Sequence, residues 1–238
     1  GVRAAEIATA ITPRTKMILL GNPNNPTGAV VPRAELEGIA KLAVEHDLVV
    51  ASDEVYSRLV YGTEHVSIAT LPGMQERTVL LDGFSKAYAM TGWRVGYVAA
   101  SMHILEAMLK VHQYAIMCAG TSAQEAALEA LRHGEEDVAR MHADYARRGT
   151  MFVEGLNRIG LPTTAPRGAF YAFPYIGATG MTDEEFAEKL LFEEKVAVVP
   201  GSSFGAAGVG YVRAAYCTAY DKLEESLVRI ERFLKSHA

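Results

Sequence analysis

Three short apolar runs, each followed at once by a cluster of polar residues, constrain the fold of this chain more than any other feature. Four or five apolar residues bounded by turn-forming residues are typical of a buried strand. The runs and their clusters are Met17–Leu20 before Gly21–Gly28, Leu48–Ala51 before Ser52–Tyr56, and the apolar part of the expected strand Thr78–Asp82 before the stretch that leads to Lys86. Open α/β sheets bind ligands at the carboxyl ends of their strands. The three clusters therefore predict a ligand site at one edge of a sheet.

Strands are expected to alternate with helices through the first hundred residues, which is typical of a largely parallel sheet. Residues 33–46 should form an amphipathic helix, because Leu36, Ile39 and Ala43 recur at helical spacing after Pro32. Further expected elements are a strand at 95–100 and helices at 104–114, 123–131 and 135–159. The last helix is long enough to bridge two domains.

The final third of the chain has a different pattern. The expected elements are strands at 168–173, 196–199 and 211–216, and helices at 183–195 and 223–236, the first of them capped by Thr182. Gly201–Gly210 precedes a strand, whereas a dinucleotide fingerprint precedes a helix, so we interpret it as a mobile active-site loop. We expect residues 1–145 to belong to a large domain and residues 146–238 to form a small α+β domain.

Composition excludes several classes of function. A chain of 238 residues with 50% hydrophobic content can bury a large core. Its net charge of −5 comes from mixed acids and bases, so neither a nucleic-acid stripe nor a membrane-binding polybasic cluster is expected. No apolar segment approaches a bilayer span, and the first residues lack a signal-peptide layout. A cytoplasmic protein with small-molecule partners is the expectation.

The cysteines and histidines do not indicate a metal centre. Cys118 and Cys217 are far apart, and both lie in segments expected to pack against the core, so we interpret them as buried thiols. None of the seven histidines falls in a His-Glu-x-x-His pattern or beside a Cys-x-x-Cys pattern. No catalytic metal is expected.

Lys86 carries the most specific chemical signal. An apolar run ends near this amine, and Arg94 follows downstream in Ser85-Lys-Ala-Tyr-Ala-Met-Thr-Gly-Trp-Arg-Val-Gly-Tyr97. An amine in apolar surroundings near another cation loses its proton more easily, and the neutral amine attacks carbonyl groups. With Asn-Pro-Thr-Gly28 and Asp-Glu-Val-Tyr56 upstream in the same order, the chain resembles fold-type I pyridoxal-phosphate enzymes over essentially its whole length. Within that group it resembles the class I/II aminotransferases.

The resemblance implies a three-layer α/β sandwich with a mostly parallel sheet, an incomplete large cofactor-binding domain, and a small α+β C-terminal domain. It also implies a cofactor, pyridoxal 5′-phosphate, bound as a Schiff base on Lys86. Asp53 would pair with the pyridine nitrogen, and Asn25 and Tyr56 would hydrogen-bond the phenolic oxygen. Glu54 would point to the other face of its strand.

The remaining implied roles concern the phosphate and the substrate. Arg94 would clamp the phosphate, a task that suits the bidentate guanidinium, and Ser85 would add a hydroxyl. One branch of the family has serine three residues before the lysine; this chain has Gly83, which offers only its backbone N–H there. Arg213 would bind the α-carboxylate of the amino-acid substrate. Phe170 and Tyr171 are candidates both for the substrate pocket and for core packing.

The function implied is transfer of an amino group between an α-amino acid and a 2-oxo acid, with Lys86 moving the proton at Cα. A homodimer is expected, as is usual in the family. Two alternatives stay open: a carbon–sulfur β-lyase of the same fold, and a non-catalytic aminotransferase-like binding domain. The sequence does not assign the amino-acid donor, and aspartate, aromatic and alanine-type donors all remain possible.

The first sixteen residues contain only a short helical fragment before the first expected strand. In the resembled family a substantial N-terminal portion precedes this point and supplies a phosphate-binding turn and an aromatic ring that stacks on the cofactor. We therefore expect either a fragment of a longer enzyme or a chain that receives those parts from elsewhere. A truncated sheet should expose an edge and apolar surface.

Overall fold

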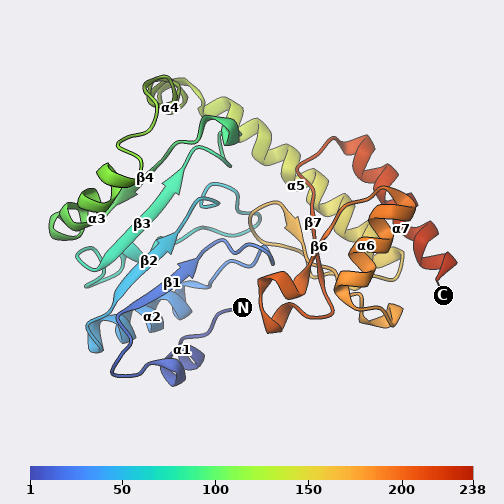
Figure 1. Ribbon diagram of the computed structural model, residues 1–238, viewed down its shortest axis with the longest axis horizontal. Coiled ribbons are helices and arrows are strands. Elements are labelled where there is room, and N and C mark those ends of the chain that lie inside the picture. The colour runs from blue at the N-terminus through green and yellow to red at the C-terminus, as the bar shows by residue number, and fades with distance from the viewer. Residues whose placement is uncertain (238) are drawn as a thin grey trace. The chain divides into compact units, whose positions relative to one another are not determined.

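The computed structural model describes residues 1–237 and contains two compact units (Figure 1). The first unit comprises Gly1–Pro23 and Ala29–His142; the second comprises Asn24–Gly28 and the residues from Ala143 onward. The short segment Asn24–Gly28 thus groups with the C-terminal part of the chain, which no local sequence pattern indicates. Assigning these units to the large and small domains of an aminotransferase, with the boundary expected after residue 145, remains a proposal.

The first unit is built on a four-stranded sheet. Its strands, in spatial order, are β1 (Met17–Gly21), β2 (Val49–Asp53), β3 (Thr78–Gly83) and β4 (Gly96–Ala99). β1, β2 and β3 are parallel, and β4 is antiparallel to β3. The prediction of an α/β fold with a mostly parallel sheet is confirmed.

Helix α2 (Arg33–Glu45) connects β1 to β2 and covers the core of this sheet. Leu36, Ile39 and Ala43 are buried on its inner face and cluster with apolar residues of the first two strands, such as Leu20 and Val50. Burial of one of the leucine, isoleucine or valine side chains stabilises the fold by about 1.5–3 kcal/mol. Helix α1 (Ala4–Ala10) precedes β1, and its first backbone N–H donates to the Glu35 carboxylate at 2.7 Å.

The expected alternation of strands and helices holds only for β1–α2–β2. Between β2 and β3 the described chain forms turns and one short 3-10 helix, Ile68–Thr70, instead of an α-helix. Pro72 and Gly73 lie near the end of this connection, and such residues favour turns over helices. A long irregular connection therefore replaces the second helix of the expected pattern.

Three helices follow β4: α3 (Met102–Ala115), α4 (Thr121–His133) and α5 (Glu135–Arg158). Helix α5 begins in the first unit and continues into the second. No residue of α3 is buried, and its apolar side chains Leu109, Val111 and Tyr114 are 57–89% exposed. Leu19 on β1 is also 77% exposed. The first unit thus has the exposed apolar surface that the sequence predicts.

The second unit contains a small antiparallel sheet and two further helices. The strands β5 (Tyr171–Ala172), β6 (Val199–Pro200) and β7 (Val212–Ala215) are arranged in the order β5-β7-β6, and the helices are α6 (Asp183–Glu194) and α7 (Tyr220–Ser236). The cap predicted at Thr182 is confirmed, since Thr182 and Glu185 form a reciprocal capping box. β5 is shorter than the predicted strand 168–173 because Ala169 has φ 58°, which interrupts an extended chain.

The prediction that both cysteines are buried is wrong. Cys118 follows α3 and Cys217 follows β7, and both are exposed. Cys118 is exposed because it follows α3, a helix of which no residue is buried within the described part of the chain. Among residues 1–237, no helix is long and apolar enough to cross a membrane, and no three His, Cys, Asp or Glu side chains gather into a metal-binding cluster.

Candidate active site

Three of the predicted cofactor residues lie at one edge of the first unit's sheet. Asp53 is the last residue of β2, and Lys86 lies three residues beyond the end of β3. Arg94 lies two residues before β4, whose first residue, Gly96, pairs with Gly83 at the end of β3. Because β2 and β3 are parallel and β4 is antiparallel, these positions all fall at the carboxyl edge of the parallel strands.

Lys86 lies in a turn between the buried residues Phe84 and Ala87, and its side chain is half-buried. Its Nζ lies over the Tyr56 ring, 5.8 Å from the ring centroid. Tyr56 is only 5% exposed, so its ring provides an apolar wall for the amine. Ser85 precedes the lysine and is also half-buried. The structure therefore brings Lys86 and Tyr56 together, as their predicted roles require.

Asp53 and Glu54 have opposite environments, as alternation along an extended strand predicts. Asp53 is exposed, and its Oδ1 accepts the Val55 N–H at 3.2 Å. Glu54 is 3% exposed and is held by the Ser52 and Ser67 hydroxyls, at 2.9 and 2.8 Å, and by His65 Nε2 at 2.8 Å. Full hydrogen bonding makes a buried carboxylate tolerable, and here it fixes the end of β2 that presents Asp53.

Arg94 has a backbone and an electrostatic environment that suit an anion-binding role. Its φ is 55°, in the left-handed region, and its Nη1 donates to the Thr91 carbonyl at 2.9 Å. The side chain is exposed, and among the described residues no carboxylate forms an ion pair with it. An amine, an exposed carboxylate and an unpaired guanidinium at one sheet edge are the groups that pyridoxal phosphate requires, so this donor set fits the cofactor.

Asp82 is a member of this edge that sequence reasoning missed. Its Oδ1 accepts the Gly83 N–H at 2.6 Å, and its Oδ2 accepts the Tyr97 hydroxyl at 3.1 Å. Burial, assisted by the charge of Glu54, raises the pKa of the Asp82 carboxyl above its usual range. Burial and the Asp82 charge raise the pKa of Tyr97 to about 12. The position of Asp82 at a strand end was the only sequence signal that could have singled it out.

The second unit contains the other two predicted site residues, and they are in contact. Arg213 lies on β7, and its Nη1 donates to Asn25 Oδ1 at 2.8 Å, across 188 residues of sequence. The Arg213 Cζ lies over the ring of Tyr171, 4.6 Å from its centroid, and 5.0 Å from the centroid of Phe204. Arg213 Nε is buried without a hydrogen-bond partner, and no described carboxylate pairs with this guanidinium. The sequence assigned Asn25 and Arg213 to different ligands and did not predict their contact.

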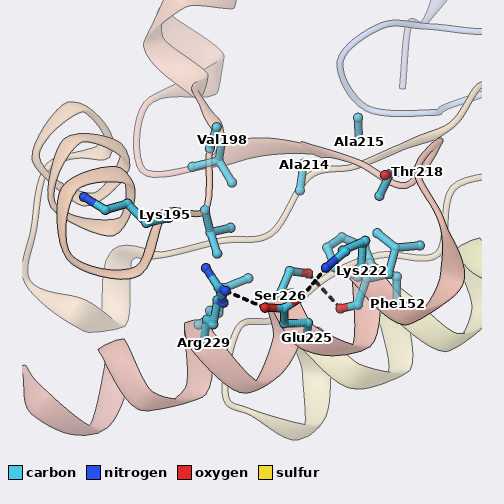
Figure 2. Close-up of a pocket in the computed structure, with 14 residues that line it drawn as sticks. Phe152, Lys195, Val198, Ala214, Ala215, Thr218, Lys222, Glu225, Ser226 and Arg229 are labelled. Atoms are coloured by element: carbon cyan, nitrogen blue, oxygen red, sulfur yellow. Dashed lines mark hydrogen bonds and ion pairs between the residues drawn. The ribbon is translucent and has the colours of Figure 1, made fainter.

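A pocket of about 370 Å³ in the second unit is separate from these residues (Figure 2). It lies between α7 and the segment Lys195–Val198, and none of the predicted site residues lines it. Its cations already have partners: Lys195 Nζ donates to the Phe192 carbonyl at 2.8 Å, and Lys222 and Arg229 both pair with Glu225. The pocket therefore offers no unpaired charge for a ligand.

Comparison with known proteins identifies the class to which this fold and these residues belong. The family model for aminotransferase class I and II matches residues 1–230, and the chain belongs to this family. Members of the family depend on pyridoxal phosphate.

Individual relatives agree with the family assignment. The chain is 56% identical over 231 residues to a putative aminotransferase, YugH, of Bacillus subtilis, and 51% identical over 233 residues to an aspartate aminotransferase of Pyrococcus abyssi. Each match covers 97% of this chain and 60% of the relative. The crystal structure of an aromatic aminotransferase from Pyrococcus horikoshii superposes with a TM-score of 0.96 at 48% identity, covering 99% of this chain and 64% of that one. The chain thus spans about three fifths of the length of these relatives.

Proposed function

We propose that the whole protein is a pyridoxal-phosphate-dependent aminotransferase that moves an amino group between an α-amino acid and a 2-oxo acid. The observation that carries this proposal is the placement of Lys86, Asp53 and Arg94 at one edge of the sheet, which brings an amine, an acid and a guanidinium to the same place. Membership of the aminotransferase family supports it.

Each residue of the first unit has a task that its environment suits. The exposed Asp53 carboxylate would hold a protonated ring nitrogen, and the Tyr56 hydroxyl would donate to a phenolate oxygen. Arg94 and Ser85 would hold the phosphate through charge-assisted hydrogen bonds. When bound, pyridoxal phosphate supplies an electron sink for the bonds at the substrate's Cα. Lys86 Nζ, once released from the cofactor, would take the proton from the substrate's Cα and deliver it to the cofactor's C4′.

In the second unit, Arg213 would bind the substrate's α-carboxylate. A guanidinium matches a carboxylate through two parallel N–H···O bonds, and this geometry fixes the orientation of the Cα–H bond. Asn25, which accepts a hydrogen bond from Arg213 Nη1, limits the orientations open to that guanidinium. The predicted role of Asn25 toward the cofactor's phenolic oxygen remains part of the proposal.

We also propose an amino acid and a 2-oxo acid as substrates, a homodimer as the assembly, and the cytoplasm as the compartment. These proposals rest on the family resemblance. The relatives named above differ in the amino acid in their names, aspartate for one and aromatic for another. The donor is therefore to be found by screening.

Borohydride trapping tests the proposal directly. The full-length protein is titrated with pyridoxal phosphate, reduced, digested and analysed by mass spectrometry, with Lys86→Ala as the test variant and Lys41→Ala, an exposed lysine of α2, as the matched control. In the wild type and in Lys41→Ala we expect the reduced cofactor to be attached to the Lys86 peptide. This label should be lost when an amino acid is added before reduction. A label elsewhere, or one that no amino acid removes, would contradict the proposal. Release of pyruvate from a cysteine conjugate would favour the β-lyase alternative.

A further inference from the structure

The guanidinium of Arg213 is held by aromatic rings. Its Cζ lies over Tyr171, at 4.6 Å, and over Phe204, at 5.0 Å, and both distances are within the range of cation–π attraction. A guanidinium is planar and weakly hydrated, so it stacks on rings better than an ammonium group does. A ring that stacks on a guanidinium leaves the N–H groups, which lie in the guanidinium plane, for hydrogen bonds. Asn25 accepts one of them.

Phe204 reaches Arg213 from a loop that contains regular turns and is held by a hydrogen bond to α6. The segment Gly201–Gly210 contains two 3-10 turns instead of an irregular loop. A buried carboxylate, Asp183, accepts the Ser202 N–H at 2.7 Å. A Cβ on Gly208 would lie 2.0 Å from the Gly201 carbonyl oxygen. The backbone at Gly208 therefore lies so close to the backbone at Gly201 that only glycine fits there.

Further aromatic contacts hold the Phe204 ring from within the same unit. Phe173 meets Phe204 edge-to-face, with centroids 6.4 Å apart, and stacks on Tyr211 at 5.1 Å and an interplanar angle of 2°. Edge-to-face and stacked pairs each add stabilisation beyond the area that they bury. Phe204, which contacts Arg213, is thus part of a row of rings that ends at Tyr211, directly before β7.

We propose that Phe204 is a positioning residue for the substrate carboxylate: its ring restricts Arg213 to the orientation in which two N–H groups face an α-carboxylate. This inference rests on the proposed function, because it requires Arg213 to bind that carboxylate. Its consequence is that Phe204 contributes to selectivity for amino acids over amines without touching the substrate.

Phe204 is a better site for a test than Tyr171. Tyr171 is 6% exposed and belongs to the core, so its replacement would disturb packing, whereas Phe204 is 38% exposed. Phe204→Leu removes the ring and keeps an apolar side chain. Phe204→Tyr keeps the ring. Phe192→Leu, on the outer face of α6 and 66% exposed, is the matched control.

The experiment uses the full-length protein loaded with cofactor and measures single-turnover half-reactions by cofactor absorbance. Each variant reacts with the wild type's preferred amino acid and with the amine that lacks only the carboxylate. We expect Phe204→Leu to lose about tenfold in the rate constant with the amino acid and little with the amine, the loss expected when a partly desolvated cation–π contact is removed. Phe204→Tyr and Phe192→Leu should keep the wild-type ratio. Equal loss for both compounds would show a merely structural role.

The outcomes separate this inference from the proposed function. If the wild type reacts with amino acids and Phe204→Leu keeps the wild-type ratio of amino acid to amine, the inference is overturned and the proposed function stands. If the wild type carries the cofactor on Lys86 but reacts with no amino acid, the proposed function falls, and the inference with it. Thermal melting of each variant checks that it is folded.

Discussion

The predicted residues of the first unit are placed by short-range structure, whereas Arg213 in the second unit is held by contacts between distant parts of the chain. Asp53 ends β2, and Lys86 and Arg94 lie within three residues of a strand end. Arg213, by contrast, meets Asn25 across 188 residues and also contacts two rings. A strand end determines where a residue lies, but only tertiary contacts determine how its side chain is held.

The largest expected effect tests the short-range region. Lys86→Ala should lower the turnover rate by about 10⁴-fold, because it removes both the covalent anchor and the proton-transfer group. The fold should be unchanged, since the side chain is only half-buried. Steady-state kinetics measure the loss of turnover, and a melting curve checks that the fold is unchanged. Lys41→Ala is the control for both. If the variant retained a tenth of the activity, another group would have to anchor the cofactor and transfer the proton.

The core under the sheet edge gives the next largest effect. Leu36 on α2 is 1% exposed, and Leu36→Ala should lower the free energy of unfolding by about 2–5 kcal/mol, since a cavity replaces a buried side chain. The exposed Leu191→Ala on α6 is the comparison and should cost less than about 1 kcal/mol. Urea denaturation measures both. Equal losses would show that α2 does not anchor the sheet as its burial indicates.

The contrast between the two regions explains which features could be predicted from the sequence and which could not. Apolar periodicity predicted α2 and β2, and residue type predicted the cap at Thr182, because each depends on residues a few positions apart. It did not predict that Asn24–Gly28 groups with the second unit, or that Cys118 is exposed, because both depend on which surfaces meet. In the candidate site, family motifs supplied the residues, but the contacts of Arg213 with Asn25 and Phe204 required the structure.

Arg213 tests the long-range region with a charge-preserving change. Arg213→Lys should raise KM for the amino acid about 30- to 100-fold, because an ammonium group can neither form the bidentate pair nor stack as well on two rings. Binding of the cofactor to Lys86 should be unaffected. Kinetics together with the borohydride assay separate these effects. If lysine sustains wild-type KM, charge alone suffices and the aromatic environment of Arg213 is irrelevant to binding.

The smallest effect concerns Asp82, whose contact with the Tyr97 hydroxyl, like that of Lys86 with Tyr56, is a tertiary contact within the first unit. Asp82→Asn keeps an acceptor for the Gly83 N–H and removes a half-buried charge. Because the folded-state pKa of Asp82 is raised, its contribution to stability is fully present below the ordinary aspartate pKa of about 4 and is lost as pH rises through the folded value. The wild type should therefore lose stability relative to Asp82→Asn as pH increases above about 4. Solvent screens a partly exposed charge, so the difference should stay below about 1 kcal/mol.

Tyr97→Phe decides whether this pH dependence belongs to Asp82. The Tyr97 hydroxyl donates to the charged form of Asp82 and so lowers the pKa of that carboxyl, against the larger effect of burial. Without the hydroxyl the folded-state pKa of Asp82 should rise further, so the loss of stability above about pH 4 should be larger and should extend to higher pH. Free energies of unfolding for the wild type, Tyr97→Phe, Asp82→Asn and the double variant, measured between pH 4 and 8, give the answer. A pH profile that Tyr97→Phe leaves in place would assign the titration to another carboxylate.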